Sequence, residues 1–195
     1  YSTLNIHLVD EIEEADVLLG VKEVPITNLI QDKTYIFFSH TIKEQPYNRE
    51  LLREVLKKNI TLLDYEVLTD KHGARIVAFG RYAGIVGAYN GLLTYGKKFD
   101  LFSIRRAHEC FDLEDLMTEL PKVSLPPVKI VVTGGGRVAG GAMEILDGAG
   151  IKKVSPDELL DNSYDFPVYA NLLPEHYNKR IDGGQYSDND FFANP

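Results

Sequence analysis

Two hydrophobic segments near the start of the chain each end at a titratable side chain. Residues 15–21 run into Lys22, and residues 35–39 run into His40. Open α/β sheets place ligands and chemistry at the carboxyl ends of their strands. A lysine and a histidine at two neighbouring strand ends would form an acid–base pair, so the pattern predicts proton-transfer chemistry. The alternative for Lys22 is an ordinary solvated lysine at the end of a strand.

A glycine-rich turn provides the second pattern. Residues 128–133 have the composition of a buried strand and run directly into Gly-Gly-Gly-Arg-Val-Ala at 134–139. This is the Gly-x-Gly-x-x-Ala form of the dinucleotide fingerprint, in the strand–turn–helix context that it requires. The pattern predicts a bound nicotinamide dinucleotide, NAD or NADP. The alternative is a tight strand–helix turn that binds no ligand.

Each position of this turn has a physical role in the prediction. Gly134 permits the tight turn, Gly136 lets the backbone approach a pyrophosphate, and Ala139 lets the helix lie against the strand. Arg137 and Val138 begin the helix, whose unpaired N–H groups and dipole favour phosphate. These five residues are therefore the predicted coenzyme contacts.

The residue that would hold the coenzyme ribose is less clear from the sequence. An acidic residue about 20 positions after the fingerprint, at the end of the second strand, normally takes this role. Here the expected second strand is 151–154, and Ser155 follows it. Residues 155–158 have the pattern of a helix capping box with a proline at the first helical position. We therefore assign Asp157 and Glu158 to a helix start and Ser155 to the coenzyme site, which leaves NAD and NADP both open.

The elements that must position these residues alternate between strand and helix. Residues 49–58 carry leucines and a valine at helical spacing, and Asn59 follows as a typical helix stop. We expect strands at 17–21, 33–39, 60–63 and 76–79. Alternation at this spacing indicates an α/β fold with a mostly parallel sheet.

The second half of the chain begins with a helix of unusual composition. Residues 84–96 are apolar and rich in small side chains, so we expect a buried helix that packs closely on a neighbour. Gly140 and Gly141 weaken the helix after the glycine turn, which also indicates that another element packs very close there. A domain boundary is expected at 97–100, and a further helix at 113–120.

The composition excludes several classes of protein. The chain has 195 residues, of which 44% are hydrophobic, so it can bury a core. Its formal net charge of −8 argues against nucleic acid as a partner, and it has no apolar run near the ~20 residues of a membrane span. The single cysteine, Cys110, excludes an internal disulfide framework and fits a reducing, cytoplasmic compartment. No metal site is predicted, because the histidines and the cysteine lack ligand spacing.

With both halves in view, the chain resembles the alanine dehydrogenase/saccharopine dehydrogenase superfamily, and among its members the lysine–2-oxoglutarate reductases. Residues 20–84 carry the specific part of this resemblance, which spans nearly the whole chain. The matching motifs are Leu-Gly-Val-Lys-Glu at 19–23, Phe-Phe-Ser-His-Thr-Ile-Lys at 37–43, Asp-Tyr-Glu at 64–66, Gly-Ala-Arg at 73–75, Val-Ala-Phe-Gly at 77–80, Pro-Glu-His at 174–176 and Asp-Gly-Gly-Gln-Tyr-Ser at 182–187.

The resemblance implies a fold, a reaction and a set of site residues. It implies two Rossmann-like domains with an active-site cleft between them, both incomplete in this chain: a substrate domain at 1–98 and an NAD(P)-binding domain at 99–195. It implies that Lys22 and His40 are the acid–base residues, that Arg75 contacts a substrate carboxylate, and that Glu66 and Phe79 line the site.

The implied reaction joins the ε-amine of lysine to the ketone of 2-oxoglutarate and reduces the imine with hydride from a nicotinamide, which gives saccharopine. The partners would be these small molecules. Parts of both domains would lie outside the sequence, so we expect the chain alone to be poorly active and to associate with itself to cover exposed sheet edges.

Two other functions fit the same residues. An alanine dehydrogenase-like enzyme would use ammonia and a small 2-oxo acid, and the lysine–histidine pair would serve it equally well. A non-catalytic dinucleotide-binding module would use the glycine turn alone.

Overall fold

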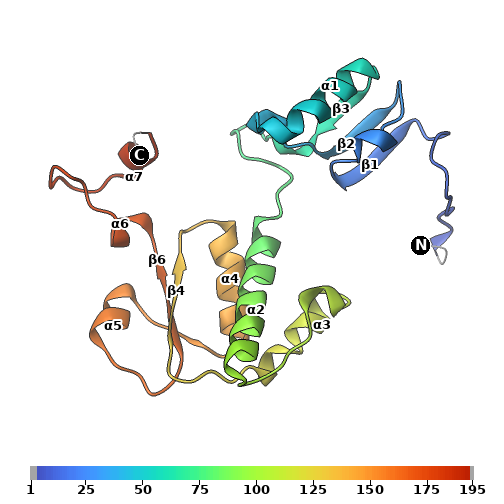
Figure 1. The fold of residues 1–195 in the computed structure, drawn as a ribbon. Helices are drawn as coiled ribbons and strands as arrows, with labels where there is room; N and C mark the ends of the chain where they lie inside the picture. The colour runs from blue at the N-terminus through green and yellow to red at the C-terminus, as the bar shows by residue number, and fades with distance from the viewer. Residues whose placement is uncertain (1–3, 194–195) are drawn as a thin grey trace. The chain divides into compact units, whose positions relative to one another are not determined.

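The computed structural model describes residues 4–193 as an α/β chain with two compact units, Tyr1–Ala78 and Phe79–Pro195. Each unit contains a three-stranded sheet, and all strand pairs within these sheets are parallel (Figure 1). The structure therefore confirms the predicted α/β class with parallel sheets. Within the described residues, no helix combines the length and the apolar composition that a bilayer span needs.

The first unit is built on a sheet of strand order β1-β2-β3. In the register of the sheet, Thr34 is aligned with both Val17 and Thr61, so the three carboxyl ends lie along one edge. The strands are β1 (Val17–Lys22), β2 (Thr34–Phe38) and β3 (Thr61–Asp64). Short 3-10 helices at Ile26–Asn28, Thr41–Lys43, Pro46–Asn48 and Tyr65–Val67 connect these elements.

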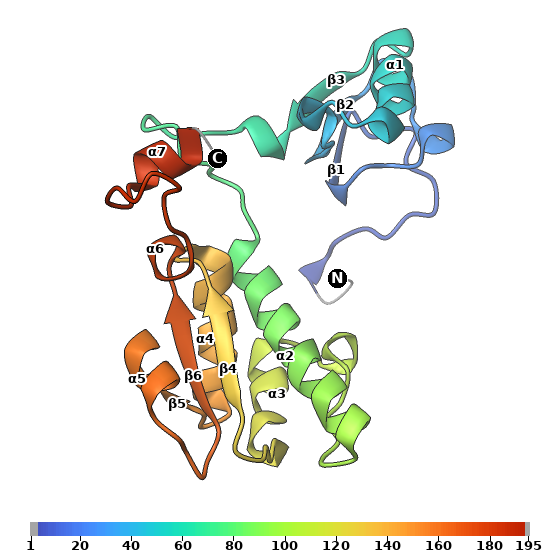
Figure 2. The same ribbon diagram turned by 60° about the vertical axis from the view of Figure 1, so that its left-hand side comes forward.

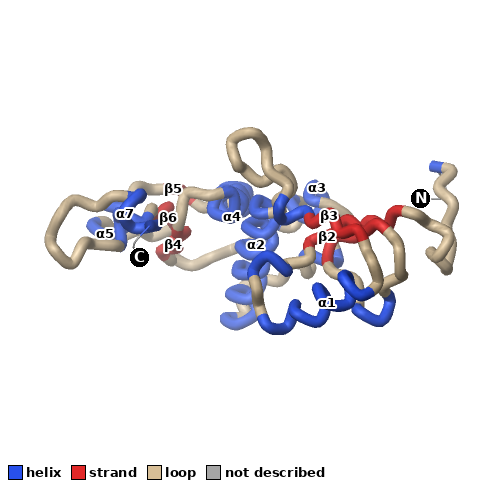
Figure 3. The backbone as a smooth tube through the Cα atoms, turned by 90° about the horizontal axis from the view of Figure 1, so that it is seen from above, coloured by secondary structure: helices blue, strands red, loops and turns tan. Residues whose placement is uncertain are grey.

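One helix, α1 (Arg49–Lys57), covers a face of this sheet (Figure 3). Its buried Leu51 and Val55 pack with Tyr35 and Phe37 of β2, because leucine and valine recur on one side of the helix. The helix ends where the sequence predicts, since Asn59 adopts a left-handed conformation with φ of 50°.

The strand predicted at 76–79 is wrong. These residues form no strand; the only ladder contact nearby is an isolated antiparallel bridge between Thr69 and Arg75. Ile76 is 65% exposed, and Phe79 is already the N-cap of the next helix. An apolar run of four residues has too little periodicity to distinguish a strand from the approach to a helix.

The second unit carries the glycine turn. Its sheet has the order β4-β6-β5, and Figure 2 shows β6 lying beside β4. The sequence did not lead us to expect β6, which lies in the middle of the sheet. The elements are α2 (Gly80–Phe99), α3 (Leu113–Met117), β4 (Lys129–Thr133), α4 (Arg137–Gly148), β5 (Lys152–Lys153), α5 (Pro156–Asp161), β6 (Val168–Leu172), α6 (Pro174–Tyr177) and α7 (Asp188–Ala193).

The contact between α2 and α4 sets the boundary between the units. A Cβ atom on Gly84 would lie 1.9 Å from the carbonyl oxygen of Val138, and one on Gly141 would lie 2.0 Å from that of Arg81. The two backbones therefore touch, as the small residues of both helices predict. Because α2 packs in this way, it belongs to the second unit, and the compact units divide after Ala78 and not near residue 98.

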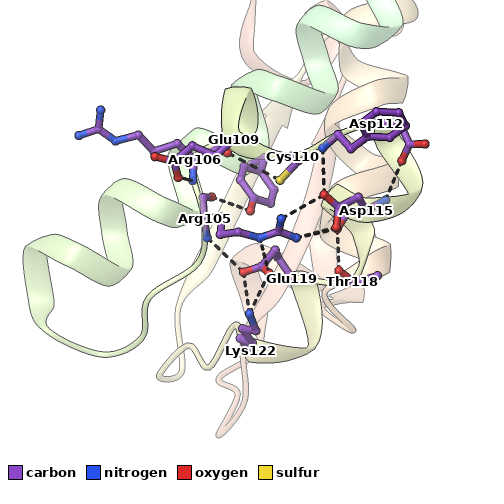
Figure 4. Close-up of polar contacts among 11 residues, drawn as sticks. Arg105, Arg106, Glu109, Cys110, Asp112, Asp115, Thr118, Glu119 and Lys122 are labelled. Atoms are coloured by element: carbon purple, nitrogen blue, oxygen red, sulfur yellow. Dashed lines mark hydrogen bonds and ion pairs between the residues drawn. The ribbon is translucent and has the colours of Figure 1, made fainter.

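A polar network holds the connection between α2 and α3. Figure 4 shows the guanidinium of Arg105 between two carboxylates: it donates to Asp115 at 2.7 Å and to Glu119 at 2.8 Å. Hydrogen bonds from Arg105 and the Phe111 backbone lower the pKa of Asp115 to about 2. The phenol of Tyr89 donates to the carbonyl oxygen of Arg105 at 2.7 Å, which anchors the network to α2.

Candidate active site

Lys22 and His40 meet at the carboxyl edge of the first sheet. Lys22 is the last residue of β1, and His40 follows β2 by two residues. Because Lys22 aligns with Phe38 in the parallel register, the two side chains emerge at the same edge. Their Nζ and Nε2 atoms are 3.1 Å apart. The structure thus brings together the two residues that the sequence analysis paired.

The backbone at His40 is turned sharply to achieve this. His40 adopts a left-handed conformation with φ of 56°, which costs a non-glycine residue on the order of 1 kcal/mol. Two neighbours hold it in place. Ser39 is fully buried, and both its N–H and its hydroxyl donate to the carboxylate of Asp64 at the end of β3. The same hydroxyl accepts from the N–H of Thr41 at 3.1 Å.

Glu66 lies behind the imidazole. Its side chain is only 7% exposed, and its Oε2 lies 3.0 Å from His40 Nδ1. Oε1 lies 3.0 Å from the ammonium of Lys43 and 3.6 Å from the guanidinium of Arg75. The backbone positions the carboxylate, since the N–H of Glu66 donates to Asp64 at 2.9 Å.

These contacts determine the charge on Glu66. Burial acts to raise its pKa, but hydrogen bonds from Lys43 and His40 and their positive charge outweigh burial, so the pKa lies below its ordinary value of 4.5. The site therefore contains a buried anion at neutral pH, with cationic groups gathered around it.

The buried carboxylate also orients the imidazole. A carboxylate can only accept, so a hydrogen bond to Glu66 needs a proton on His40 Nδ1, and the ammonium of Lys43 lies 3.3 Å from the same nitrogen. Nε2 faces Lys22 Nζ at 3.1 Å, within hydrogen-bond distance. Such a pair can accept a proton at one nitrogen and donate one from the other.

Aromatic rings support this pair from one side. The Lys22 ammonium lies 5.7 Å from the centroid of the Phe38 ring, within the range of a cation–π contact. The same ring stacks on His40, with 6.3 Å between ring centroids, and contacts the Tyr65 ring in a tilted arrangement at 5.3 Å. The sequence analysis missed Phe38 as a site residue, although its position in the Phe-Phe-Ser-His motif could have indicated it.

Arg75 is a site cation with access to solvent. Its side chain is 50% exposed, and a loop closed by Asp70 presents it. The carboxylate of Asp70 accepts from the N–H groups of His72 and Ala74, at 2.8 and 3.0 Å. Phe79, the other residue predicted to line the site, belongs to the second unit, so its place beside a substrate stays a prediction.

The glycine turn of the second unit is built from backbone groups. Gly134 has φ of +87°, so the turn needs glycine there. Around Gly136 no atom lies within 4 Å of an added Cβ, and no side chain caps the helix that follows. The first N–H groups of α4, from Arg137 onward, are therefore open to an anionic group such as a pyrophosphate. Ala139 is buried, as the fingerprint requires.

Asn171 of β6 holds this turn and was not predicted. Its side-chain amide donates to the carbonyl oxygens of Val132 and Gly134, at 3.0 and 2.8 Å. The N–H of Gly134 donates in turn to the carbonyl oxygen of Leu172 at 2.8 Å. No fingerprint could indicate Asn171, because its strand was not recognised.

Comparison with known proteins shows which proteins the chain is similar to. The alanine dehydrogenase/PNT N-terminal domain family matches residues 1–86. The mitochondrial alpha-aminoadipic semialdehyde synthase of Bos taurus is 37% identical over 200 residues, which cover 90% of this chain and 22% of that protein. The NAD(+), L-lysine-forming saccharopine dehydrogenase of Neurospora crassa is 29% identical over 191 residues, 91% of this chain and 47% of that protein. The chain is thus similar to proteins of the alanine dehydrogenase/saccharopine dehydrogenase superfamily.

The match to this superfamily has a defined extent. The chain spans less than half the length of either relative. A solved structure of an L-alanine dehydrogenase aligns with a TM-score of 0.43 and 17% identity, over 82% of this chain and 43% of that one. The name of the Neurospora crassa relative specifies NAD(+), in agreement with the predicted class of cofactor.

One predicted contact of the superfamily's coenzyme site has another partner in this structure. The hydroxyl of Ser155 accepts from the N–H of Glu158 at 3.1 Å, while the carboxylate of Glu158 accepts from the N–H of Ser155 at 2.8 Å. This is the predicted capping box of α5. Ser155 also follows β5, and β6 separates β5 from the fingerprint strand. Its role in binding a coenzyme therefore stays a prediction.

Proposed function

We propose that the chain supplies the acid–base and coenzyme-binding residues of an NAD(P)-dependent saccharopine dehydrogenase. The enzyme would join the ε-amine of lysine to the ketone of 2-oxoglutarate and reduce the resulting imine, or run in reverse. The observation that carries this proposal is the 3.1 Å distance between Lys22 Nζ and His40 Nε2, with the carboxylate of the buried Glu66 3.0 Å from the other imidazole nitrogen.

The chemistry needs both halves of this pair. The ε-amine of lysine arrives as an ammonium and must lose a proton before its nitrogen attacks the ketone carbon. The hydroxyl of the resulting carbinolamine must then gain a proton to leave as water. The neutral nitrogen of the Lys22–His40 pair accepts the first proton, and the protonated nitrogen supplies the second.

Charge around the pair fits dicarboxylate and amino-acid substrates. The half-exposed guanidinium of Arg75 offers a forked donor to a carboxylate. Lys43, 48% exposed, adds positive potential on the same side of Glu66. The Glu66 carboxylate already holds both Arg75 and Lys43 in place. Their side chains therefore lose little conformational entropy when a substrate binds.

The glycine turn fits the coenzyme part of the proposal. The uncapped first turn of α4 and the open space at Gly136 suit a pyrophosphate, and Arg137 adds a cation at the helix start. The bound nicotinamide would supply the hydride that reduces the imine, a step that needs no further acid or base from the protein. A cytoplasmic location remains part of this proposal.

The decisive test is a kinetic comparison in the longest natural form of the protein. Oxidation of NADH and NADPH is followed with lysine plus 2-oxoglutarate and, separately, with ammonia plus pyruvate. Turnover with the first pair supports the proposal. Turnover with the second pair alone would indicate the alanine dehydrogenase-like enzyme, which the match of residues 1–86 also favours.

Substitutions then test the pair itself. Lys22→Met and His40→Gln should each lower kcat at least about 100-fold, because each removes one of the two side chains that transfer protons. The exposed Lys97 and His108 provide matched controls, and Lys97→Met and His108→Gln should leave turnover unchanged. Normal turnover in either Lys22→Met or His40→Gln would show that the acid–base assignment is wrong.

A further inference from the structure

The side chains of the first site are held by the backbone in two different ways. Lys22 is part of β1, so the hydrogen bonds between β1 and β2 fix its position. His40 and Glu66 lie beyond the ends of β2 and β3. The last aligned pair of those two strands is Phe37 with Asp64, so strand pairing reaches neither side chain. The imidazole and the carboxylate behind it therefore need another link to stay at a fixed distance.

The carboxylate of Asp64 provides this link. On the side of β2, its Oδ1 accepts from the N–H of Ser39 at 3.3 Å, and its Oδ2 accepts from the hydroxyl of Ser39 at 2.5 Å. On the side of β3, Oδ1 also accepts from the N–H of Glu66 at 2.9 Å. Because Ser39 precedes His40, one carboxylate joins the two backbone segments that carry the imidazole and its acceptor.

This carboxylate contributes geometry and not a charge pair. Asp64 is 8% exposed and Ser39 is fully buried. Within residues 4–193 the structure gives Asp64 no ion pair, whereas Glu66 faces the ammonium of Lys43. Two oxygens that can only accept are satisfied by three donors, two of them backbone N–H groups. A buried group with these contacts fixes the positions of its donors, because each donor left unpaired would cost free energy.

His40 needs this restraint because its backbone is in a sparsely populated conformation. Its φ of 56° and ψ of 9° are left-handed. The hydroxyl of Ser39 also accepts from the N–H of Thr41 at 3.1 Å and lies 2.7 Å from the Thr41 hydroxyl. The residues on both sides of His40 are thus connected to Asp64. Without these bonds the backbone of His40 is free to relax, and the imidazole would leave its place between Lys22 and Glu66.

We propose that Asp64 is a positioning residue for the acid–base pair, and that it acts through Ser39 and through the backbone of Glu66. The kinetic part of this inference rests on the proposed function. Proton transfer depends steeply on geometry, and a displacement of about 1 Å can cost about 100-fold in rate. Because Asp64 acts by geometry, an uncharged side chain of the same shape should be able to replace it.

Two substitutions at Asp64 test this in the longest natural form of the protein, with lysine, 2-oxoglutarate and each reduced coenzyme. Asp64→Ala removes all three hydrogen bonds. We expect kcat per folded molecule to fall about 10- to 100-fold, with the folded fraction measured by circular dichroism. The KM for 2-oxoglutarate should change less than about threefold, since Arg75 is presented by a separate loop closed by Asp70.

The conservative variant should restore turnover. Asp64→Asn keeps an acceptor for both N–H groups, and its amide can donate to the Ser39 hydroxyl, so kcat should stay within about threefold of the wild type. Ser39→Ala is a milder test on the side of β2, because it leaves the bond between Asp64 and the N–H of Glu66 in place. It should lower kcat by about 3- to 10-fold.

NMR of isotope-labelled histidine in this chain tests the positioning without any turnover. The shifts of the two ring nitrogens report which of them carries a proton, and His40→Gln identifies the His40 signals. At about pH 8 we expect Nδ1 to carry a proton in the wild type and in Asp64→Asn, as a hydrogen bond to Glu66 needs. In Asp64→Ala and, to a smaller extent, in Ser39→Ala, this proton should be shared with Nε2. Lower stability alone would weaken the signals of the folded protein and leave their shifts unchanged.

Asp112 provides the matched control. Its carboxylate accepts from the N–H of Asp115 at 2.9 Å at the start of α3, which is the same kind of contact in the second unit. Asp112→Ala should leave both kcat and the His40 shifts unchanged.

The outcomes separate this inference from the proposed function. Wild-type His40 shifts in folded Asp64→Ala, or in Ser39→Ala if Asp64→Ala does not fold, would overturn the inference. So would a loss of kcat in Asp64→Asn as large as in Asp64→Ala. If the wild type does not turn over lysine plus 2-oxoglutarate while the His40 shifts respond as expected, the proposed function fails and the positioning of His40 by Asp64 stands.

Discussion

The two candidate sites of this molecule use different chemical groups, side chains at one and the backbone at the other. At the edge of the first sheet the chemistry belongs to side chains, with Lys22 and His40 3.1 Å apart and a buried carboxylate behind them. At the glycine turn it belongs to the backbone, because open N–H groups and the absence of side chains form the site. The first site depends on residue identity, and the second depends on how closely other elements pack around it.

This difference predicts different responses to substitution. The side-chain site can lose its chemistry and keep its fold, since its strands are held by the core of Tyr35, Phe37 and α1. The backbone site should lose its fold first, because α2 and β6 shape the turn and hold its strand and helix.

The largest effect is expected where α2 and α4 touch. In Gly141→Val, the new side chain would meet the carbonyl of Arg81, where even a Cβ would lie at 2.0 Å. Because the obstacle is backbone, the helices must separate, and we expect the second unit to lose more than about 3 kcal/mol of stability. Hydrogen exchange should report loss of protection in α2, α4 and β4, while amides of β2 keep theirs.

Gly140 provides the matched control for this substitution. It is the preceding residue of the same helix, but nothing lies within 4 Å of its added Cβ. Gly140→Ala should therefore raise stability slightly, by about 0.5–1 kcal/mol, through helix propensity alone. Equal damage from Gly140→Ala and Gly141→Val would mean that helix packing does not shape the turn.

The same difference explains what the sequence could predict. Lys22, His40 and the glycine turn follow hydrophobic strands, so local pattern was sufficient to find them. Phe38 was missed because a buried aromatic at a strand end has the same pattern whether or not it supports a cation. Asn171 was missed because β6 lies far from the turn in sequence, and only the strand order brings it there. Packing between distant segments leaves no signal in either segment alone.

The next largest effect is expected at Glu66. Folding lowers the pKa of Glu66, so the ionised carboxylate stabilises the first unit at pH values above 4.5, the ordinary pKa of the group. This contribution is lost as the pH falls through the folded-state pKa. In Glu66→Gln, we expect the free energy of unfolding to fall by about 2 kcal/mol at pH 7, since hydrogen bonds from His40 and Lys43 lose their charged acceptor. The stability of the variant should also depend less on pH in the acidic range.

Urea unfolding at pH 7 and at several values below 4.5 measures both effects. Glu54→Gln provides the control, because Glu54 makes i,i+3 and i,i+4 ion pairs with Lys57 and Lys58 on the surface of α1. Such pairs contribute about 0.5 kcal/mol or less, so the control should change little. Equal losses in the two variants would mean that the first site is no more organised than a surface ion pair.

The smallest effect, and the finest test of the comparison, is expected at Asn171. In Asn171→Leu, which is similar in size, the carbonyl oxygens of Val132 and Gly134 each lose a donor, at a cost of about 1 kcal/mol. The strand pairing of β4 and β6 uses backbone groups and should persist. If Asn171 keeps the glycine turn in shape, its loss should free Gly134 from the orientation that a pyrophosphate needs. Affinity for NADH should then fall by about tenfold while the second unit stays folded. Unchanged affinity in a folded Asn171→Leu variant would show that the turn keeps its shape by itself, and the contrast with the Lys22–His40 site would then rest on α2 alone.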